Sequence, residues 1–208
     1  MNSRPVFVKV CGITRLQDAD LAADLGATAI GFIFWPGSPR YVSPEDARGI
    51  ARRKAAGVKA VGVFVDEPAA RVRQIAELVG LDMVQLHGSE SPTVVRDVSR
   101  AIGVIKAVSL TNGAAPDLSE FDDDVLILLD AHDPVRRGGT GRTIDWEAAR
   151  TIAASRRTIL AGGLTPENVG EAVSAVQPYG IDVSSGVESA PGVKDAARLK
   201  RLFEALND

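Results

Sequence analysis

The sequence predicts an α/β protein in which eight parallel strands close into a (β/α)8 barrel, the TIM-barrel architecture. Short apolar runs recur eight times along the 208 residues, and most of them are followed by a longer segment with helical spacing. Continuous apolar strands separated by helices indicate a parallel sheet that is buried on both faces. The strands are evenly spaced and no early GxGxxG motif accompanies them, which favours a closed barrel over an open doubly wound sheet.

The elements follow one another in a regular order. We expect the strands at 6–10, 29–34, 60–65, 83–86, 103–108, 125–129, 158–161 and 181–184. Helical spacing predicts helices at 15–26, 44–56, 68–80, 91–102, 146–154, 166–176 and 193–206, whereas the connection 110–123 has weak helical character. A proline marks four expected helix starts, because a first helical turn tolerates it; it follows Ser43, Glu67, Ser91 and Thr165. Two glycines mark expected helix ends, at Gly26 and Gly80.

Length and composition limit the class of protein. We expect residues 1–208 to form one barrel domain with short loops, since ~200 residues is near the lower limit for this fold. The net charge of −3 and the mixed charge pattern give no reason to expect nucleic-acid or membrane partners. One cysteine rules out an internal disulfide, and no apolar stretch is typical of a signal peptide or membrane span. We therefore expect a soluble cytoplasmic protein.

Polar residues and glycines gather at the ends of the expected strands. In barrels of this kind the chemistry takes place at the carboxyl ends of the strands. The first strand ends at Cys11, the fourth at His87 and the sixth at Asp130, and Arg40 lies in the loop after the second. A barrel with a purely structural role has no need of such a pattern, so we expect a functional site at this end.

The last two of these loops predict a phosphate site. Gly162 and Gly163 follow the seventh strand, and Ser184, Ser185 and Gly186 follow the eighth. Glycines let the backbone come close to an anion, and N–H groups at a helix start donate hydrogen bonds to it. Either loop alone could be no more than a tight turn. The two together favour phosphate, because barrels commonly bind it after strands seven and eight.

Two side chains at the strand ends, and a lysine near one of them, suggest acid–base chemistry. Cys11 could be a small buried hydrophobic residue or a reactive thiol. Asp130 ends an apolar run, where a carboxylate should be paired or catalytic. Lys9 has the same side-chain direction as Cys11, so it should point into the barrel and need a carboxylate partner, for which Asp182 on the neighbouring strand is the natural candidate.

Further candidates are less specific. His87 could be a hydrogen-bonded residue at a strand end or a ligand contact. Arg40 lies between Pro39 and Tyr41 in a stiff loop, which suits a planar clamp for a carboxylate. The glycine-rich segment 138–142 could act as a lid or as a second phosphate contact.

The motifs together resemble one family, the phosphoribosylanthranilate isomerases of tryptophan biosynthesis. The resemblance covers residues 8–195 and rests on ordered motifs: KVCGITR, GFIFWPGSPRYVS, VGVFVDE, VQLHGSE, LLDA, GGTGRTIDW, LAGGLTPENV and DVSSGVESAPGVKD. It implies a (β/α)8 barrel and an Amadori rearrangement that converts N-(5-phosphoribosyl)anthranilate to a carboxyphenylamino-deoxyribulose phosphate. No metal or organic cofactor is implied.

The resemblance also implies roles for the candidate residues. It makes Cys11 the general base and Asp130 the general acid, and it places Arg40 on the anthranilate carboxylate. The expected substrate-binding residues are Arg40, His87, Gly162, Gly163, Asp182, Ser184, Ser185 and Gly186. The only partner we expect is the small phosphorylated substrate, and both a monomer and a homodimer fit the sequence.

Three other functions fit the sequence less well. The related aminoaldose isomerase of histidine biosynthesis would have an aspartate at the position of Cys11. A metal-dependent sugar-phosphate epimerase is disfavoured because the chain has two histidines and few soft ligands. A non-catalytic phosphate-binding barrel would have no need of both Cys11 and Asp130.

Overall fold

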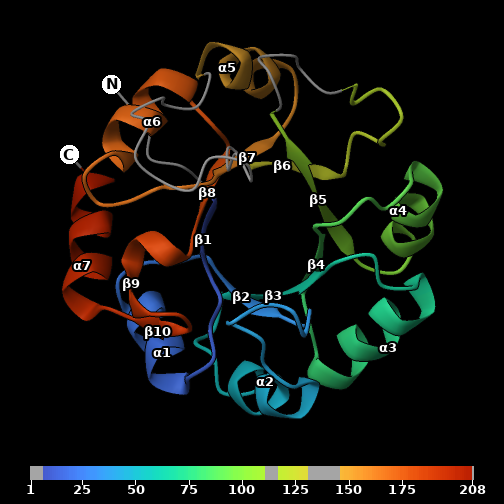
Figure 1. The fold of residues 1–208 in the computed structure, drawn as a ribbon, viewed down its shortest axis with the longest axis horizontal. Coiled ribbons are helices and arrows are strands. Elements are labelled where there is room, and N and C mark those ends of the chain that lie inside the picture. Colours follow the sequence, from blue (N-terminus) through green and yellow to red (C-terminus); the bar gives the residue numbers. More distant parts are fainter. Residues whose placement is uncertain (1–6, 111–116, 131–145, 208) are drawn as a thin grey trace.

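The eight main strands form a closed, all-parallel barrel (Figure 1). The structure is a computed structural model and describes residues 7–110, 117–130 and 146–207. Each strand pairs with the next, and β8 pairs with β1, which confirms the predicted barrel. The strands are β1 (Phe7–Cys11), β2 (Ala29–Ile33), β3 (Lys59–Phe64), β4 (Met83–Leu86), β5 (Gly103–Ser109), β6 (Leu126–Asp130), β7 (Thr158–Ala161) and β8 (Gly180–Val183).

Helices surround this barrel (Figure 1). Those in the described residues are α1 (Leu16–Asp24), α2 (Pro44–Ala51), α3 (Ala69–Val79), α4 (Pro92–Ser99), α5 (Trp146–Ser155), α6 (Val169–Val176) and α7 (Ala196–Ala205). Ser43 and Ser91 cap α2 and α4, and proline follows each of them at the first helical position. Gly80 ends α3 in the left-handed conformation with φ 78°, where glycine avoids the steric cost of a side chain.

Two helix starts differ from the sequence prediction. The segment after Thr165 begins as a turn, and α6 starts only at Val169. The helix expected over 193–206 starts at Ala196, where Asp195 caps it by accepting a hydrogen bond from the Arg198 N–H. The preceding residues form a 3-10 turn (Ser185–Val187) and an antiparallel hairpin of β9 (Glu188–Ala190) and β10 (Val193–Lys194). A hairpin this short has too few residues to show a strand pattern.

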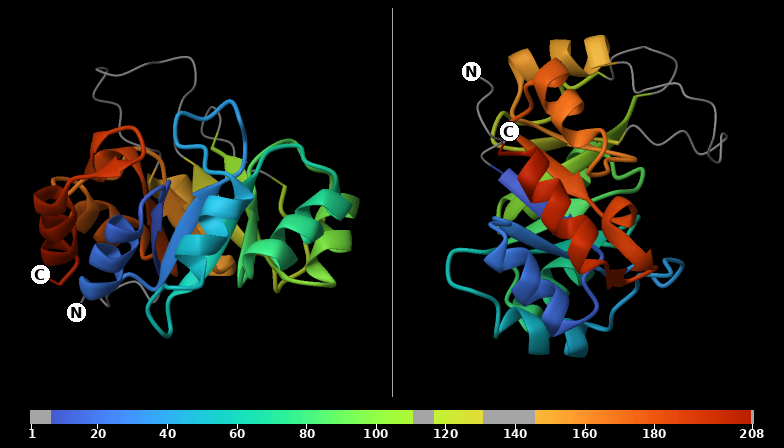
Figure 2. Two further views of the ribbon diagram at one scale, coloured as in Figure 1. Left: turned by 90° about the horizontal axis from the view of Figure 1, so that it is seen from below. Right: turned by 90° about the vertical axis from the view of Figure 1, so that its left-hand side faces the viewer.

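The core has two layers that leave one end of the barrel polar. Apolar side chains pack between the strands and the helices, and a second cluster that includes Phe7, Val61 and Ile105 fills the barrel. Side chains alternate along a strand, so Lys9 and Cys11 point inward like Phe7 but lie nearer the carboxyl end. The loop after β2 projects beyond the barrel in Figure 2 (left panel, blue). Lys9 and Cys11 therefore lie at the carboxyl end of the barrel, next to the apolar cluster that fills its interior.

Candidate active site

The carboxyl ends of the strands enclose a cavity of about 320 Å³. It is lined by all ten residues that the sequence predicts for catalysis or substrate binding, which come from the loops and ends of β1, β2, β4, β6, β7 and β8. The lining residues are Cys11, Ile33, Arg40, Val63, Gln85, His87, Asp130, Ala161, Gly162, Gly163, Leu164, Asp182, Ser184, Ser185 and Gly186. The fold thus brings together groups that are up to 175 positions apart in the chain (from 11 to 186).

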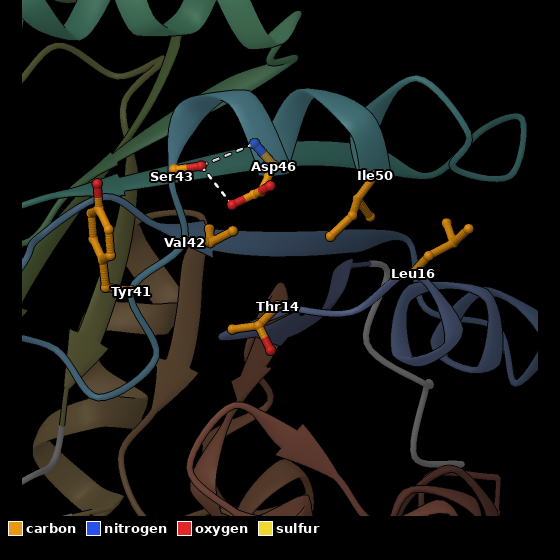
Figure 3. A pocket seen from close by; sticks show the side chains of 7 residues that line it. All are labelled: Thr14, Leu16, Tyr41, Val42, Ser43, Asp46 and Ile50. Atoms are coloured by element: carbon orange, nitrogen blue, oxygen red, sulfur yellow. Dashed lines mark hydrogen bonds between the residues drawn. The ribbon is translucent and has the colours of Figure 1, made fainter.

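Two neighbouring cavities contain fewer of the predicted site residues. One of about 450 Å³ lies between the loop after β1 and α2, and Thr14, Tyr41 and Asp46 help to line it (Figure 3). Its carboxylate, Asp46, is engaged by the Ser43 hydroxyl at 2.7 Å as part of the helix cap (Figure 3). The other, of about 320 Å³, shares His87 and Asp130 with the main cavity and continues it toward β5. We therefore take the main cavity as the candidate active site.

Cys11 lies in a buried, charged environment. Its side chain is buried, and Lys9, two residues earlier on β1, is fully buried. The Lys9 Nζ atom donates a hydrogen bond of 2.7 Å to Asp182 Oδ2, which confirms the predicted ion pair. Gly31 on β2 pairs with Cys11, and a Cβ atom there would lie 2.8 Å from Cys11 Sγ and 3.0 Å from Lys9 Cε. Strand β2 therefore needs a glycine at this position to make room for both side chains.

The charges around Cys11 act in opposite directions on its pKa. Burial raises the pKa of the Cys11 thiol above its ordinary value, Lys9 lowers it, Asp182 raises it and Lys194 lowers it. The net result is a raised pKa, because desolvation is the largest effect. For Lys9, burial lowers the pKa, but Asp182 and Cys11 outweigh this and raise it overall. Lys9 thus remains an ammonium ion that favours the thiolate.

Asp130 occupies a more open position at the end of β6. Its side chain is 24% exposed, and that of His87 is 34% exposed. The His87 Nε2 atom lies 3.3 Å from Asp130 Oδ2, and His87 Nδ1 lies 2.6 Å from Nε2 of the buried Gln85. His87 is therefore hydrogen-bonded at a strand end, as one interpretation of the sequence predicts, and it also lines the cavity, where contact with a ligand stays a prediction.

The two glycine-containing loops form one side of the cavity. Gly162 and Gly163 have φ values of 86° and 66°, which favour glycine. At Gly186 a Cβ atom would collide with the Leu164 carbonyl oxygen, so the loops after β7 and β8 touch here. Ser184 Oγ and Asp182 Oδ1 are buried without a hydrogen-bond partner among the described residues, and both residues line the cavity. Such atoms are available to a polar ligand.

Arg40 makes a contact that the sequence does not predict. Its Nε atom lies 3.0 Å from both carboxylate oxygens of Glu188, and its Nη2 atom lies 2.7 Å from Oε2. Lys194 donates to the other oxygen at 2.7 Å. Glu188 and Lys194 lie within the last family motif, but the sequence predicts a helix from residue 193, where the structure has the second strand of the hairpin. The glycine-rich segment 138–142 lies outside the described residues.

Two further observations concern the described ranges 7–110, 117–130 and 146–207. No group of three His, Cys, Asp or Glu side chains there is arranged to hold a metal ion. No helix in those ranges is long and apolar enough to cross a membrane.

Comparison with known proteins identifies the family. The family model described as N-(5'-phosphoribosyl)anthranilate (PRA) isomerase matches residues 8–205. The chain belongs to this isomerase family. N-(5'-phosphoribosyl)anthranilate isomerase of Pelobacter propionicus is 48% identical, over 95% of this chain and 94% of the relative. The Geobacter sulfurreducens isomerase is also 48% identical, over 95% and 97%. These matches confirm the predicted family and, with it, the predicted isomerase function in tryptophan biosynthesis over the alternatives.

Solved isomerase structures agree with the fold. The phosphoribosylanthranilate isomerase of Thermotoga maritima superposes with a TM-score of 0.87 at 41% identity, over 97% of this chain and 98% of that one. The Thermus thermophilus isomerase gives 0.86 at 44%, with the same coverage. A third isomerase structure, in complex with reduced 1-(o-carboxyphenylamino)-1-deoxyribulose 5-phosphate, gives 0.84 at 39%, again over 97% and 98%.

Proposed function

We propose that this chain converts N-(5-phosphoribosyl)anthranilate to 1-(2-carboxyphenylamino)-1-deoxyribulose 5-phosphate, with Cys11 as general base and Asp130 as general acid. The observation that carries the proposal is that a thiol on β1 and a carboxyl group on β6 line one cavity with the two glycine-containing loops. Strands 1 and 6 lie apart around the barrel, so the two groups can approach one substrate from different sides (Figure 1).

The acid acts first in this mechanism. Asp130 donates a proton to the furanose ring oxygen, the bond from carbon 1 to that oxygen breaks, and the nitrogen lone pair forms an iminium ion. His87, at 3.3 Å from Asp130 Oδ2, helps to hold the carboxyl group in the cavity. The iminium ion then serves as the electron sink for the next step, so the reaction needs no metal or organic cofactor.

The base completes the rearrangement. The Cys11 thiolate removes the proton from carbon 2, and the electron pair moves to the iminium, which gives an enolamine. Loss of the proton from the carbon 2 hydroxyl and gain of one at carbon 1 then give the aminoketose. Lys9 supports this step because its ammonium ion, paired with Asp182 at 2.7 Å, opposes the burial that disfavours a thiolate. Acid–base assistance of this kind contributes ~10²–10⁴-fold per group.

The remaining residues bind the two ends of the substrate. The backbone at Gly162–Gly163 and the loop from Ser184 to Gly186 would hold the phosphate, with the buried Ser184 hydroxyl as a donor. Arg40 would bind the anthranilate carboxylate at the opposite end. A crystal grown with sulfate or phosphate should hold the anion between Gly163 and Ser185, and an anion bound only elsewhere at the barrel mouth would contradict this assignment.

The setting of the reaction is part of the same proposal. All residues in the mechanism come from one chain, so either a monomer or a homodimer can carry it out; the Thermotoga maritima relative is described as dimeric. A single cysteine that must remain a free thiol suits the reducing cytoplasm.

The decisive experiment is a fluorescence assay that follows the disappearance of phosphoribosylanthranilate. We expect turnover of this substrate and little or none of the histidine-pathway aminoaldose. Turnover of the second compound alone, or binding of the first without turnover, would overturn the proposed function.

A further inference from the structure

A buried cluster of three charges connects separate parts of the candidate active site. Glu188, at the start of the β9–β10 hairpin, is buried, and its carboxylate contacts both Arg40 and Lys194. The Lys194 side chain is fully buried, and that of Arg40 is 20% exposed. Arg40 lines the cavity whereas Glu188 does not, so the carboxylate lies behind the guanidinium.

Lys194 ties this cluster to the base and to the loop after β8. Its Nζ atom donates 2.6 Å to the Cys11 carbonyl oxygen, 2.7 Å to Glu188 Oε1 and 3.3 Å to the Ser184 carbonyl oxygen. An ammonium group has three donors, and these three acceptors use all of them. A shift of Glu188 or Lys194 would therefore alter the hydrogen bonds that Lys194 makes to the backbone of β1 and of the loop after β8.

Contacts with the loop after β1 and with α1 fix the hairpin itself. The backbone N–H of Lys194 donates to Asp18 Oδ2 at 3.1 Å, and the Thr14 hydroxyl donates to the Gly192 carbonyl oxygen at 2.6 Å. The Gly192 N–H in turn approaches Glu188 Oε1 at 3.4 Å. The carboxylate of Glu188 is thus a fixed point to which the guanidinium of Arg40 is attached.

The geometry of the contact decides which edge of Arg40 is available. Glu188 occupies the edge formed by Nε and Nη2, so the edge formed by Nη1 and Nη2 is the one that can receive a second carboxylate side by side. The stem of Arg40 also lies close over Gly12, where a Cβ atom would be 2.7 Å from Arg40 Cδ. These two restraints leave the guanidinium little freedom.

The charges of Arg40, Glu188 and Lys194 also favour a carboxylate ligand at Arg40. With Lys194 as an ammonium ion, Glu188 carries one negative charge between two positive charges, so the cluster has one positive charge in excess. Burial lowers the pKa of Lys194, and Glu188, which accepts its hydrogen bond at 2.7 Å, opposes this effect. Burial raises the pKa of Glu188, but its hydrogen bonds to Arg40 and Lys194 outweigh this and lower it overall. Glu188 therefore stays ionised, and the excess charge suits a ligand that brings a carboxylate.

We propose that Glu188, held by Lys194, is a positioning residue that aims Arg40 at the carboxylate of the substrate. This inference rests on the proposed function, because it requires Arg40 to bind that carboxylate. Glu188 does not touch the substrate in this arrangement. It acts by removing the conformational freedom of Arg40 before binding, so that little entropy is lost when the second carboxylate is received.

The test uses two reduced product analogues that differ in one group. One is the reduced carboxyphenylamino-deoxyribulose phosphate, and the other is the same compound without its ring carboxylate. The ratio of their dissociation constants measures carboxylate recognition alone, in wild-type protein, in Arg40→Met and in Glu188→Gln. Glu188→Gln keeps the shape of the side chain but removes the charge, and it turns an amide NH2 group, which can only donate, toward a cation that the Glu188 carboxylate oxygen accepts from.

We expect wild-type protein to prefer the carboxylate compound, and Glu188→Gln to reduce this preference by about 10-fold or more. KM for the substrate should rise by a similar factor while kcat falls much less, because the carboxylate interaction is the same in the ground and transition states. Adding Glu188→Gln to Arg40→Met should cause little further loss of preference. Glu188→Asp, which keeps the charge on a shorter side chain, should recover part of it.

A matched control separates positioning from general damage. Glu90 is also buried and pairs with a lysine, Lys106, at 2.8 Å, but it contacts neither Arg40 nor the hairpin in any described hydrogen bond. Glu90→Gln should lower the melting temperature without changing the ratio of the two dissociation constants. If Glu188→Gln is insoluble, the same ratio is measured on Glu188→Asp, where an unchanged ratio would contradict the proposal.

The outcomes distinguish failure of the carboxylate-binding role of Arg40 from failure of the positioning role of Glu188. If wild-type protein binds both analogues equally, Arg40 does not bind the carboxylate and that part of the proposed function fails. If Arg40→Met loses the preference but Glu188→Gln keeps it, the role of Arg40 stands and the positioning role of Glu188 is wrong.

Discussion

The two sides of the active-site mouth are built differently. On the side of β1, β8 and the hairpin, Lys9, Lys194 and Glu188 are buried and make ion pairs of 2.7 Å. On the side of β4 and β6, His87 and Asp130 are partly exposed, and the distance between them is 3.3 Å. The first side holds the proposed base, and the second side holds the proposed acid.

This difference follows from what each group has to do. A buried thiol is harder to ionise, so fixed positive charges must already be in place around Cys11 before the substrate arrives. The acid must hold a proton and reach the ring oxygen, and catalytic hydrogen bonds are often long in an unliganded site and shorten in the complex. We infer that the base side is preorganised and that substrate binding completes the acid side. Four predictions test this contrast.

The largest loss of kcat should come from replacing the proposed base, Cys11. We expect Cys11→Ala and Cys11→Ser to lower kcat by about 10³-fold or more, because neither side chain supplies an anion at neutral pH. Cys11→Asp should recover part of the activity, since a carboxylate can remove the same proton. The measurements are kcat and the affinity for the reduced product analogue, which should stay close to the wild-type value.

An inert cysteine would behave differently. If Cys11 is only a small buried hydrophobic residue, Cys11→Ala would cost some stability and leave turnover near normal. That result would remove Cys11 from the mechanism and make His87 the next candidate for the base.

The next largest loss should come from the acid. Asp130→Asn keeps the shape of the side chain and removes the proton donor, so we expect kcat to fall by about 10³-fold with little change in the melting temperature. The ring must open before carbon 2 can lose its proton, so no later step can compensate. Turnover close to wild type would mean that another group protonates the ring oxygen.

The sequence predicted the barrel strands and their side chains better than it predicted the β9–β10 hairpin. The alternation of apolar runs and helices determines the barrel, and side-chain direction on β1 was enough to pair Lys9 with Asp182. Glu188 and Lys194 were not found, because their role depends on a hairpin of five strand residues and on Arg40, which lies 148 positions away from Glu188. Contacts between loops that are distant in the chain leave no periodic signal in one sequence.

A smaller effect, on the pH dependence of kcat/KM, should distinguish the positive charge near Cys11 from the negative one. The base is active when ionised, so kcat/KM should fall as pH drops through the raised pKa of Cys11. Lys9→Met removes a charge that lowers this pKa, so the acidic limb of the pH profile should move to higher pH. Asp182→Asn removes a charge that raises it, so the limb should move to lower pH.

The direction of these shifts is the informative quantity. Lys9→Met leaves Asp182 buried without its cation, which destabilises the fold and lowers the amount of active protein. Such damage changes the height of the profile but not its position. Shifts in the same direction for both variants would show that the Lys9–Asp182 pair does not control the thiolate.

The smallest expected loss of kcat concerns His87, and it tests whether the acid side is as loosely organised as the 3.3 Å distance between His87 and Asp130 indicates. In His87→Asn the side-chain amide can place a polar atom near the position of Nδ1, which faces Gln85. In His87→Gln the longer side chain can place one near the position of Nε2, which faces Asp130. We expect His87→Asn to lower kcat by about 10-fold or less and His87→Gln to lower it still less, because the contact at 3.3 Å is a weak one. Steady-state kinetics on the two variants, with the affinity for the reduced product analogue as a control, measures the difference. A loss comparable to that of Asp130→Asn in both variants would mean that His87 transfers the proton itself, and the acid side would then be as tightly organised as the base side.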